Sequence, residues 1–228
     1  MAETTTVHRR PTEGNDVVDR AKDFWERYNR PIMIIGLSII LLAAGYLIYK
    51  KFFKEPNELK ASEAIFKAED YYRMDSLNLA LNGDGVNPGF LKIIDRYDGT
   101  KAENLSRFYA GSIFLQMGDA AKAVKHLQDF ETEAPQIQAR AYKLLGDAYA
   151  EQGKNSEALS NYKKAAGHFE KDESASSEYL FMAAYFASRV MKNQKEATTL
   201  FKELKEKYPH SERGMEADKY LAQLGVYK

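Results

Sequence analysis

Hydrophobic and polar positions divide the chain into a short amphipathic stretch, one continuous apolar run and a long region of helical periodicity. The apolar run, residues 31–49, holds nineteen positions without a charge. A helix of that length rises roughly 28 Å, which is close to the hydrocarbon thickness of a bilayer. The pattern therefore predicts a transmembrane helix over residues 31–50.

Aromatic and basic residues flank this run on both sides, as they do around membrane spans. Trp25 and Tyr28 precede it, and Phe52 and Phe53 follow it. A cleaved signal peptide is the competing interpretation, but the segment LIYKKFF offers no small-residue cleavage site. We therefore expect an uncleaved signal anchor. Four Lys and Arg lie within twenty residues before the run and five after it, so their balance favours neither orientation.

Residues 1–30 are expected to form a short polar tail followed by an amphipathic helix. Asn15 or Asp16 is the predicted N-cap of that helix. The helix either lies on a membrane surface or leads directly into the span. The Arg9-Arg10 pair stands too far from the apolar run for a twin-arginine signal.

Helical periodicity dominates residues 55–228 and predicts successive helix pairs. A helix from Pro56 to Leu79 and a short helix near Phe90 form a degenerate first hairpin, residues 56–98, around the NGDG turn at Asn82. The pairs that follow are 101–117 with 119–134, 137–152 with 154–170 and 175–192 with 194–208. A helix near 210–224 is expected to cap the array.

One stretch, AYKLLGDAYAEQGKNSEALSNYKKAA at residues 141–166, recurs along this region. Moving back 35 places sets Gly111 under Gly146 and Gly118 under Gly153. A weaker copy follows, in which Tyr185 replaces the first of these glycines. The spacing resembles the tetratricopeptide consensus, in which small residues mark the close approach of two antiparallel helices. The resemblance implies an all-α fold, in which one N-terminal transmembrane helix is followed by a right-handed solenoid of helical hairpins. The whole domain spans residues 55–228, and its repeats are expected at 104–137, 139–172 and 178–211.

Composition narrows the function further. Lys plus Arg and Asp plus Glu are both 33, so no excess of positive charge favours nucleic-acid binding. Cysteine is absent, which excludes disulfides, thiolate zinc sites and a lipid-bearing cysteine. The four histidines lack a second ligand at metal spacing, and no glycine-rich phosphate loop follows a strand pattern. We therefore expect no enzyme activity, no metal and no cofactor.

The resemblance implies that the first helix of each pair lines a concave groove that binds proteins or peptides. Aromatic and Met side chains there suit adaptable binding of apolar segments, although inter-helix packing explains many aromatic residues equally well. The candidate groove residues are Tyr109, Ser112, Arg140, Lys143, Asp147, Tyr179, Met182, Phe186 and Arg189. Phe108, Ser112 and Leu144 stand where some co-chaperones carry a carboxylate clamp, so recognition of chaperone tails is disfavoured.

The whole arrangement of tail, span and repeats resembles the YfgM family of bacterial inner-membrane proteins over roughly residues 20–228. Segments that carry the likeness include RYDGTKAENLSRFYAGSIFLQMGDAAKAVKHLQDF and AYKLLGDAYAEQGKNSEAL. The resemblance implies a scaffold in the periplasm, ancillary to the Sec translocon, a periplasmic chaperone and envelope-protein folding. The repeats are also similar to the outer-membrane assembly lipoprotein BamD. Two alternatives stay open, a structural subunit of an envelope assembly complex and a cytoplasm-facing adaptor.

Overall fold

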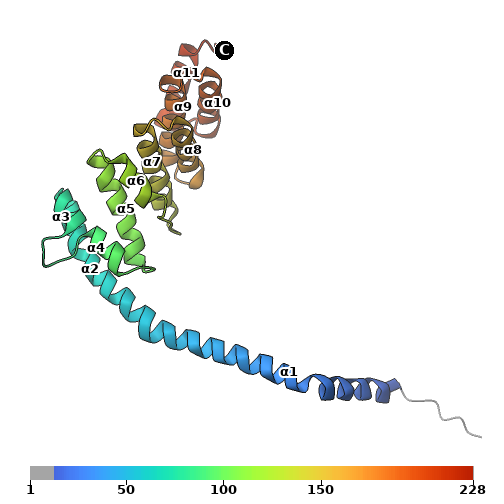
Figure 1. Ribbon diagram of the computed structural model, residues 1–228. Coiled ribbons are helices and arrows are strands. Elements are labelled where there is room, and N and C mark those ends of the chain that lie inside the picture. The colour runs from blue at the N-terminus through green and yellow to red at the C-terminus, as the bar shows by residue number, and fades with distance from the viewer. Residues whose placement is uncertain (1–12, 228) are drawn as a thin grey trace, which may run out of the picture. The chain divides into compact units, whose positions relative to one another are not determined.

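A computed structural model describes residues 13–227, and those residues are helical without a β-strand (Figure 1). The chain divides into two compact units, residues 1–56 and 57–228. The polar tail that the sequence predicts falls mainly on residues 1–12, which lie outside the described residues. The fold class is all-α, with one long apolar helix near the N-terminus and a solenoid-like series of helices after it.

The first unit is built on α1 (Glu13–Tyr49), followed by a short π-helix, η1 (Lys50–Lys54). The prediction that Asn15 or Asp16 caps this helix is wrong, because the helical backbone already includes both residues. Helix starts shift readily by one or two residues. Pro31, where the predicted span begins, lies inside α1 and removes one backbone donor without ending the helix.

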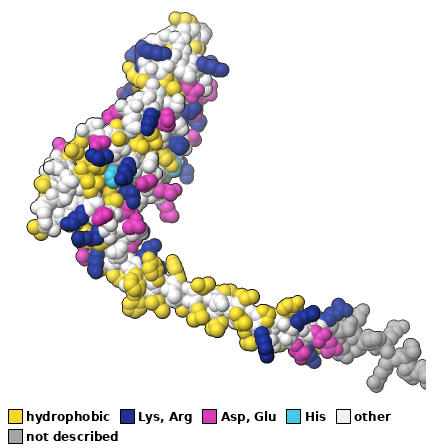
Figure 2. Space-filling view, viewed as in Figure 1, with side chains coloured by type: hydrophobic (Ala, Val, Ile, Leu, Met, Phe, Trp, Pro, Cys, Tyr) yellow, Lys and Arg dark blue, Asp and Glu magenta, His cyan; other side chains and the backbone are white. Residues whose placement is uncertain are grey.

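The apolar part of α1 has the dimensions of a membrane span. This helical stretch is long and apolar enough to cross a bilayer, and its apolar side chains are exposed. Figure 2 shows hydrophobic side chains along the visible face of α1, with charged side chains gathered toward its N-terminal part. At that part Phe24 and Tyr28 pack with ring centroids 4.9 Å apart.

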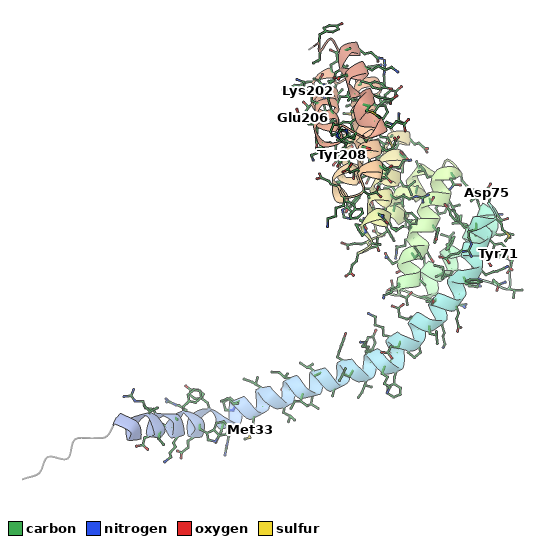
Figure 3. The ribbon with its side chains drawn as sticks, turned by 180° about the vertical axis from the view of Figure 1, so that it is seen from behind. Met33, Tyr71, Asp75, Lys202, Glu206 and Tyr208 are labelled. Carbon is green, nitrogen blue, oxygen red and sulfur yellow. The ribbon has the colours of Figure 1, made fainter. Side chains whose placement is uncertain are left out.

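The second unit opens with α2 (Glu55–Arg73), α3 (Leu77–Asn82) and α4 (Phe90–Arg96). The single helix predicted from Pro56 to Leu79 is wrong, because Asp75 adopts a left-handed φ of 56° and splits it into α2 and α3. Figure 3 labels Tyr71 and Asp75 at this end of α2. The Tyr71 hydroxyl donates to Asp84, 2.7 Å away, and ties α2 to the loop that follows α3.

Within that loop the Asp84 carboxylate accepts hydrogen bonds from the backbone N–H groups of Val86 and Asn87. These donors, the Asn87 amide and the Tyr71 hydroxyl hold the pKa of Asp84 well below its ordinary value. The loop predicted as a stop signal is therefore an ordered turn around one carboxylate.

Seven more helices complete the unit. Their bounds are α5 (Lys101–Gln116), α6 (Ala120–Leu127), α7 (Pro135–Glu151), α8 (Asn155–His168), α9 (Glu173–Arg189), α10 (Gln194–Lys207) and α11 (Glu212–Gln223). Side chains of Thr100, Asp119 and Asp172 accept the N-terminal backbone donors of α5, α6 and α9.

Helix α6 ends at Leu127, although the sequence pattern extends it to residue 134. The chain beyond it leaves the helix because other groups take its backbone hydrogen bonds. The Asn104 amide donates to the Glu131 carbonyl at 2.7 Å, and the backbone N–H of Thr132 donates to the Gln138 side chain at 2.9 Å. These contacts tie the connector to α5 and α7.

From α3 to α11 each helix packs on the next one along the chain, and α5–α7 and α9–α11 also contact one another. The aligned glycines Gly111 and Gly146 lie where the two helices of a pair approach closely. A Cβ on Gly111 would stand 2.4 Å from Leu127, and one on Gly146 would stand 2.5 Å from the Tyr162 ring. Only glycine fits at both places. Close packing of the paired helices therefore explains why small residues are predicted at these positions.

The turns between paired helices share one backbone state. Gly118 and Gly153 have φ values of 78° and 71°, and Lys192 has 56° in the corresponding turn of the third pair. Lysine in this left-handed conformation is strained in a way that glycine is not. The weaker third copy therefore keeps a left-handed residue despite losing its glycine, in a turn that is one residue longer.

Candidate functional site

The three candidates on α7 lie on one face of that helix, at intervals of three and four residues. The Lys143 ammonium pairs with Asp147 at 2.7 Å. The second carboxylate oxygen of Asp147 accepts from the Tyr162 hydroxyl at 2.9 Å. Burial and this carboxylate raise the pKa of Tyr162 far above its ordinary value. Lys143 and Asp147 thus already form an ion pair with one another at the surface.

Arg140 differs from its two neighbours on α7. It is exposed, and its guanidinium lies 6.0 Å from the centroid of the Phe108 ring of α5. Among the described residues no carboxylate forms an ion pair with it. Arg140 is therefore a cation held over an aromatic ring with its hydrogen-bonding edge available.

The candidates on α9 divide between surface and core. Tyr179 and Met182 are half-buried and pack against the C-terminal hydrophobic cluster. Phe186 is only 8 % exposed, and its ring packs edge-on against the Tyr162 ring with centroids 5.4 Å apart. Phe186 is therefore a core residue beneath the surface of α9. Burial raises the pKa of Tyr179, while the positive charge of Arg140 acts in the opposite direction. The negative charges of Asp172, Asp147 and Glu178 act in the same direction as burial.

Arg189, at the C-terminal end of α9, is exposed. Its guanidinium lies 5.7 Å from the Tyr185 ring centroid and donates to the Gln223 side chain at 2.8 Å. Among the described residues it forms no ion pair. Like Arg140, it is a cation over an aromatic ring without a carboxylate partner.

The two candidates on α5 lie under another helix. Tyr109 packs between Tyr72 of α2 at 5.0 Å and Phe90 of α4 at 4.9 Å, measured between ring centroids. Ser112 is 4 % exposed, and its hydroxyl lies 3.2 Å from the Tyr72 hydroxyl. Tyr72 of α2 therefore packs on both residues, of which Ser112 is buried and Tyr109 half-buried. Helix α5 also contacts α7.

Helix α11 supplies surface residues that the sequence reasoning missed, because it treated this helix only as a cap. Arg213 pairs with Glu178 of α9 at 2.6 Å and with Glu216 at 2.9 Å, and its guanidinium lies 4.4 Å from the Phe181 ring centroid. Tyr220 packs edge-on against Tyr185, with centroids 6.2 Å apart.

A sequence signal for these residues exists. Arg213, Glu216, Tyr220 and Gln223 each stand 34 positions after a candidate on α9. That spacing places α11 in register with the first helices of the preceding pairs.

These residues make up one set on α7, α9 and α11, the first helices of three successive pairs, of which α9 and α11 contact one another. We name it the α7–α9–α11 surface, and its members are Arg140, Lys143, Asp147, Glu178, Tyr179, Met182, Tyr185, Arg189, Arg213, Glu216, Tyr220 and Gln223. A hollow of about 610 Å³ adjoins it where α9 and α11 begin, and its lining includes Tyr179, Arg213 and His210. This surface presents the exposed ring of Tyr185, the half-buried rings of Tyr179 and Tyr220, one Met and several charged side chains.

Comparison with known proteins identifies two of the helix pairs. A family model described as Tetratricopeptide repeat matches residues 106–136 and 178–211. The first match covers most of α5 and all of α6, and the second covers most of α9 and all of α10. No curated protein and no solved structure matches the chain. The two matches and the helical hairpins between and around them support a tetratricopeptide-repeat protein.

Proposed function

We propose that this tetratricopeptide-repeat protein is a membrane-anchored, non-catalytic scaffold that binds segments of other proteins on its α7–α9–α11 surface. The observation that carries the proposal is the accessible aromatic and Met side chains on the first helices. Tyr185 is 43 % exposed, and Tyr179 and Met182 are half-buried beside it on α9.

Such side chains are suited to protein recognition. Tyr and Met provide large contact areas, and Met adapts its shape to different partners. The partly buried base of Tyr179 limits the conformational entropy that the side chain loses on binding. Tetratricopeptide-repeat proteins are typically non-catalytic scaffolds, which agrees with this assignment.

Site-specific photocrosslinking in cells tests the binding surface. A photoreactive amino acid at Met182 should capture partner proteins, whereas one at Lys195, exposed on α10, should not. The double variant Tyr179→Ala, Met182→Ala should reduce capture by a probe at Tyr185, because it removes two apolar contacts. Phe186 is left unchanged because it is buried. Equal capture at Met182 and Lys195 would contradict the proposal.

The apolar run of α1 serves as the proposed membrane anchor. The resemblance to the YfgM family supports an inner-membrane protein whose repeats lie in the periplasm, near the Sec translocon and envelope-folding factors. Protease treatment of intact cells, spheroplasts and lysed cells tests the orientation. We expect digestion of the repeat unit once the outer membrane is opened. Protection until the inner membrane is broken would instead support a cytoplasm-facing adaptor.

A further inference from the structure

A second hollow, of about 560 Å³, lies at the C-terminal end of the helical series and is lined by α10, α11 and the segment after α11. We name it the α10–α11 hollow. Its apolar lining comes from Leu221, Ala222, Val226 and Tyr227. Leu221 is buried and Val226 is half-buried, whereas Tyr227 is 79 % exposed. The hollow therefore combines an apolar floor with a large aromatic side chain that is accessible to a partner.

Helix α11 has an open flank beside this hollow. The earlier first helices lie between two second helices, since α7 contacts α6 and α8, and α9 contacts α8 and α10. Helix α11 is in register with them, but no further helix follows it among the described residues. Met215 and Ala222, seven residues apart on α11, are both exposed. Solenoid ends are ordinarily closed by a polar outer face, so an apolar hollow at this end indicates an interaction surface.

The charged residues that line the hollow are two lysines and two carboxylates. Lys205 of α10 pairs with Asp218 of α11 at 2.7 Å. Lys202 and Glu206 are exposed, stand four residues apart on one side of α10 and form no ion pair with another described residue (Figure 3). Because the four charges sum to zero, the lining offers no net attraction to a strongly acidic or strongly basic partner.

The unpaired charges of α10 match those of a second copy of the same helix. When two copies of α10 run antiparallel about a two-fold axis at the level of Leu204, Lys202 of each copy stands opposite Glu206 of the other. One symmetric contact then pairs all four of these charges. The apolar residues of both hollows lie beside the same contact, so charge and apolar surface are self-complementary together.

We propose that two copies of this chain associate through the α10–α11 hollow, about a two-fold axis that pairs Lys202 of each copy with Glu206 of the other. Burial of Tyr227 and its apolar neighbours supplies the hydrophobic contribution. The inference goes beyond the proposed function, because none of the residues that line this hollow belongs to the α7–α9–α11 surface. The dimer therefore carries two copies of that surface.

Sedimentation velocity of the full chain in density-matched detergent, over a series of protein concentrations, measures the association. We expect a monomer–dimer equilibrium for wild type. Lys202→Glu and Glu206→Lys each set like charges opposite one another and should weaken the dimer at least about tenfold. Tyr227→Ala should also weaken it, because it removes apolar contact area. Lys92→Glu, an exposed change on α4, is the matched control and should dimerise as wild type does.

Charge exchange separates a homodimer from any other use of the hollow. The double variant Lys202→Glu, Glu206→Lys regains opposite charges across the axis and should recover the dimer. A mixture of the two single variants should form heterodimers, because each contact then joins a carboxylate to an ammonium group. Differently tagged copies of the two single variants should therefore co-purify, whereas two copies of either one should not.

Three outcomes would overturn the inference. The first is a wild-type chain that stays monomeric across the concentration series. The second is a dimer that both single variants retain, since contacts elsewhere would then hold it. The third is a photoreactive amino acid at Tyr227 that captures a different protein in cells and no second copy of this chain. Circular dichroism checks that each variant keeps its helices. Capture of partners at Met182 is measured separately, so failure here is distinguishable from failure of the proposed function.

Discussion

At the scale of single residues, the helical hairpins depend on two glycines without a side chain. Gly146 faces the ring of Tyr162, which is buried and held by its hydrogen bond to Asp147. The ring has little room to move away from an added methyl group. Gly111 faces Leu127 in the same way one repeat earlier.

Gly146→Ala should therefore destabilise the repeat unit. Overpacking of this kind costs about 1–3 kcal/mol, which exceeds the gain of about 1 kcal/mol in helix propensity. Gly167→Ala, on α8 with no atom near its added Cβ, should instead stabilise by about 0.5–1 kcal/mol. Urea unfolding of the purified variants measures both. A stabilising Gly146→Ala would contradict the close packing described here.

At the scale of secondary-structure elements, the α5–α6 hairpin contains a histidine whose surroundings favour the neutral imidazole over the protonated one. His126 is 9 % exposed, stacks on Phe114 at 5.5 Å, and its Nδ1 has no hydrogen-bond partner among the described residues. Burial lowers the pKa of His126 below 6.5, and the charges of Lys125 and Arg107 add to this effect, while that of Asp129 opposes it.

Stability of this hairpin should depend on pH through His126. Because the folded-state pKa lies below the unfolded value of 6.5, the unfolded chain binds the proton more readily. The stability that neutral His126 contributes is fully present above pH 6.5 and is lost as the pH falls below that value. His126→Phe keeps the ring and cannot titrate, so it should lose less stability than wild type between pH 7.5 and 5.5.

Urea midpoints at the two pH values measure that difference. His168→Gln, an exposed change on α8, is the control and should behave as wild type. An identical pH response of His126→Phe and wild type would show that His126 does not titrate with folding.

At the scale of the whole molecule, stability of the repeat unit is distributed along its length. The buried residues form two clusters, one from Ala61 to Ala148 and one from Ala158 to Leu221, and Tyr149 packs against both. Helices mainly contact their neighbours along the chain. Such arrays tend to open locally, since each unit depends chiefly on adjacent ones.

Leu200→Ala, at a residue 1 % exposed in the C-terminal cluster, should destabilise by about 2–5 kcal/mol. Hydrogen exchange should then show faster opening of α9 and α10 than of α2 and α5. Ile113→Ala, in the N-terminal cluster, is the matched change and should reverse the order. Uniform loss of protection in both variants would indicate one fully cooperative unit.

Local spacing in the sequence determined the helical repeats. Glycines 35 residues apart mark the close approaches, because a packed hairpin tolerates no Cβ at those points. The apolar run was equally evident, since its length alone matches a bilayer. Helix ends were less visible. The end of α2 depends on the left-handed Asp75, and the end of α6 depends on a hydrogen bond that the Asn104 amide donates to a carbonyl 27 residues away.

Tertiary structure decided which candidate residues are accessible. The sequence placed Ser112 and Phe186 at groove positions, but α2 covers the first and Tyr162 packs against the second. It named no candidate on α11, whereas Arg213 and Tyr220 pack against residues of α9. Periodicity assigns a side chain to one face of its helix, and only the packing of other helices decides whether that face remains open to a partner.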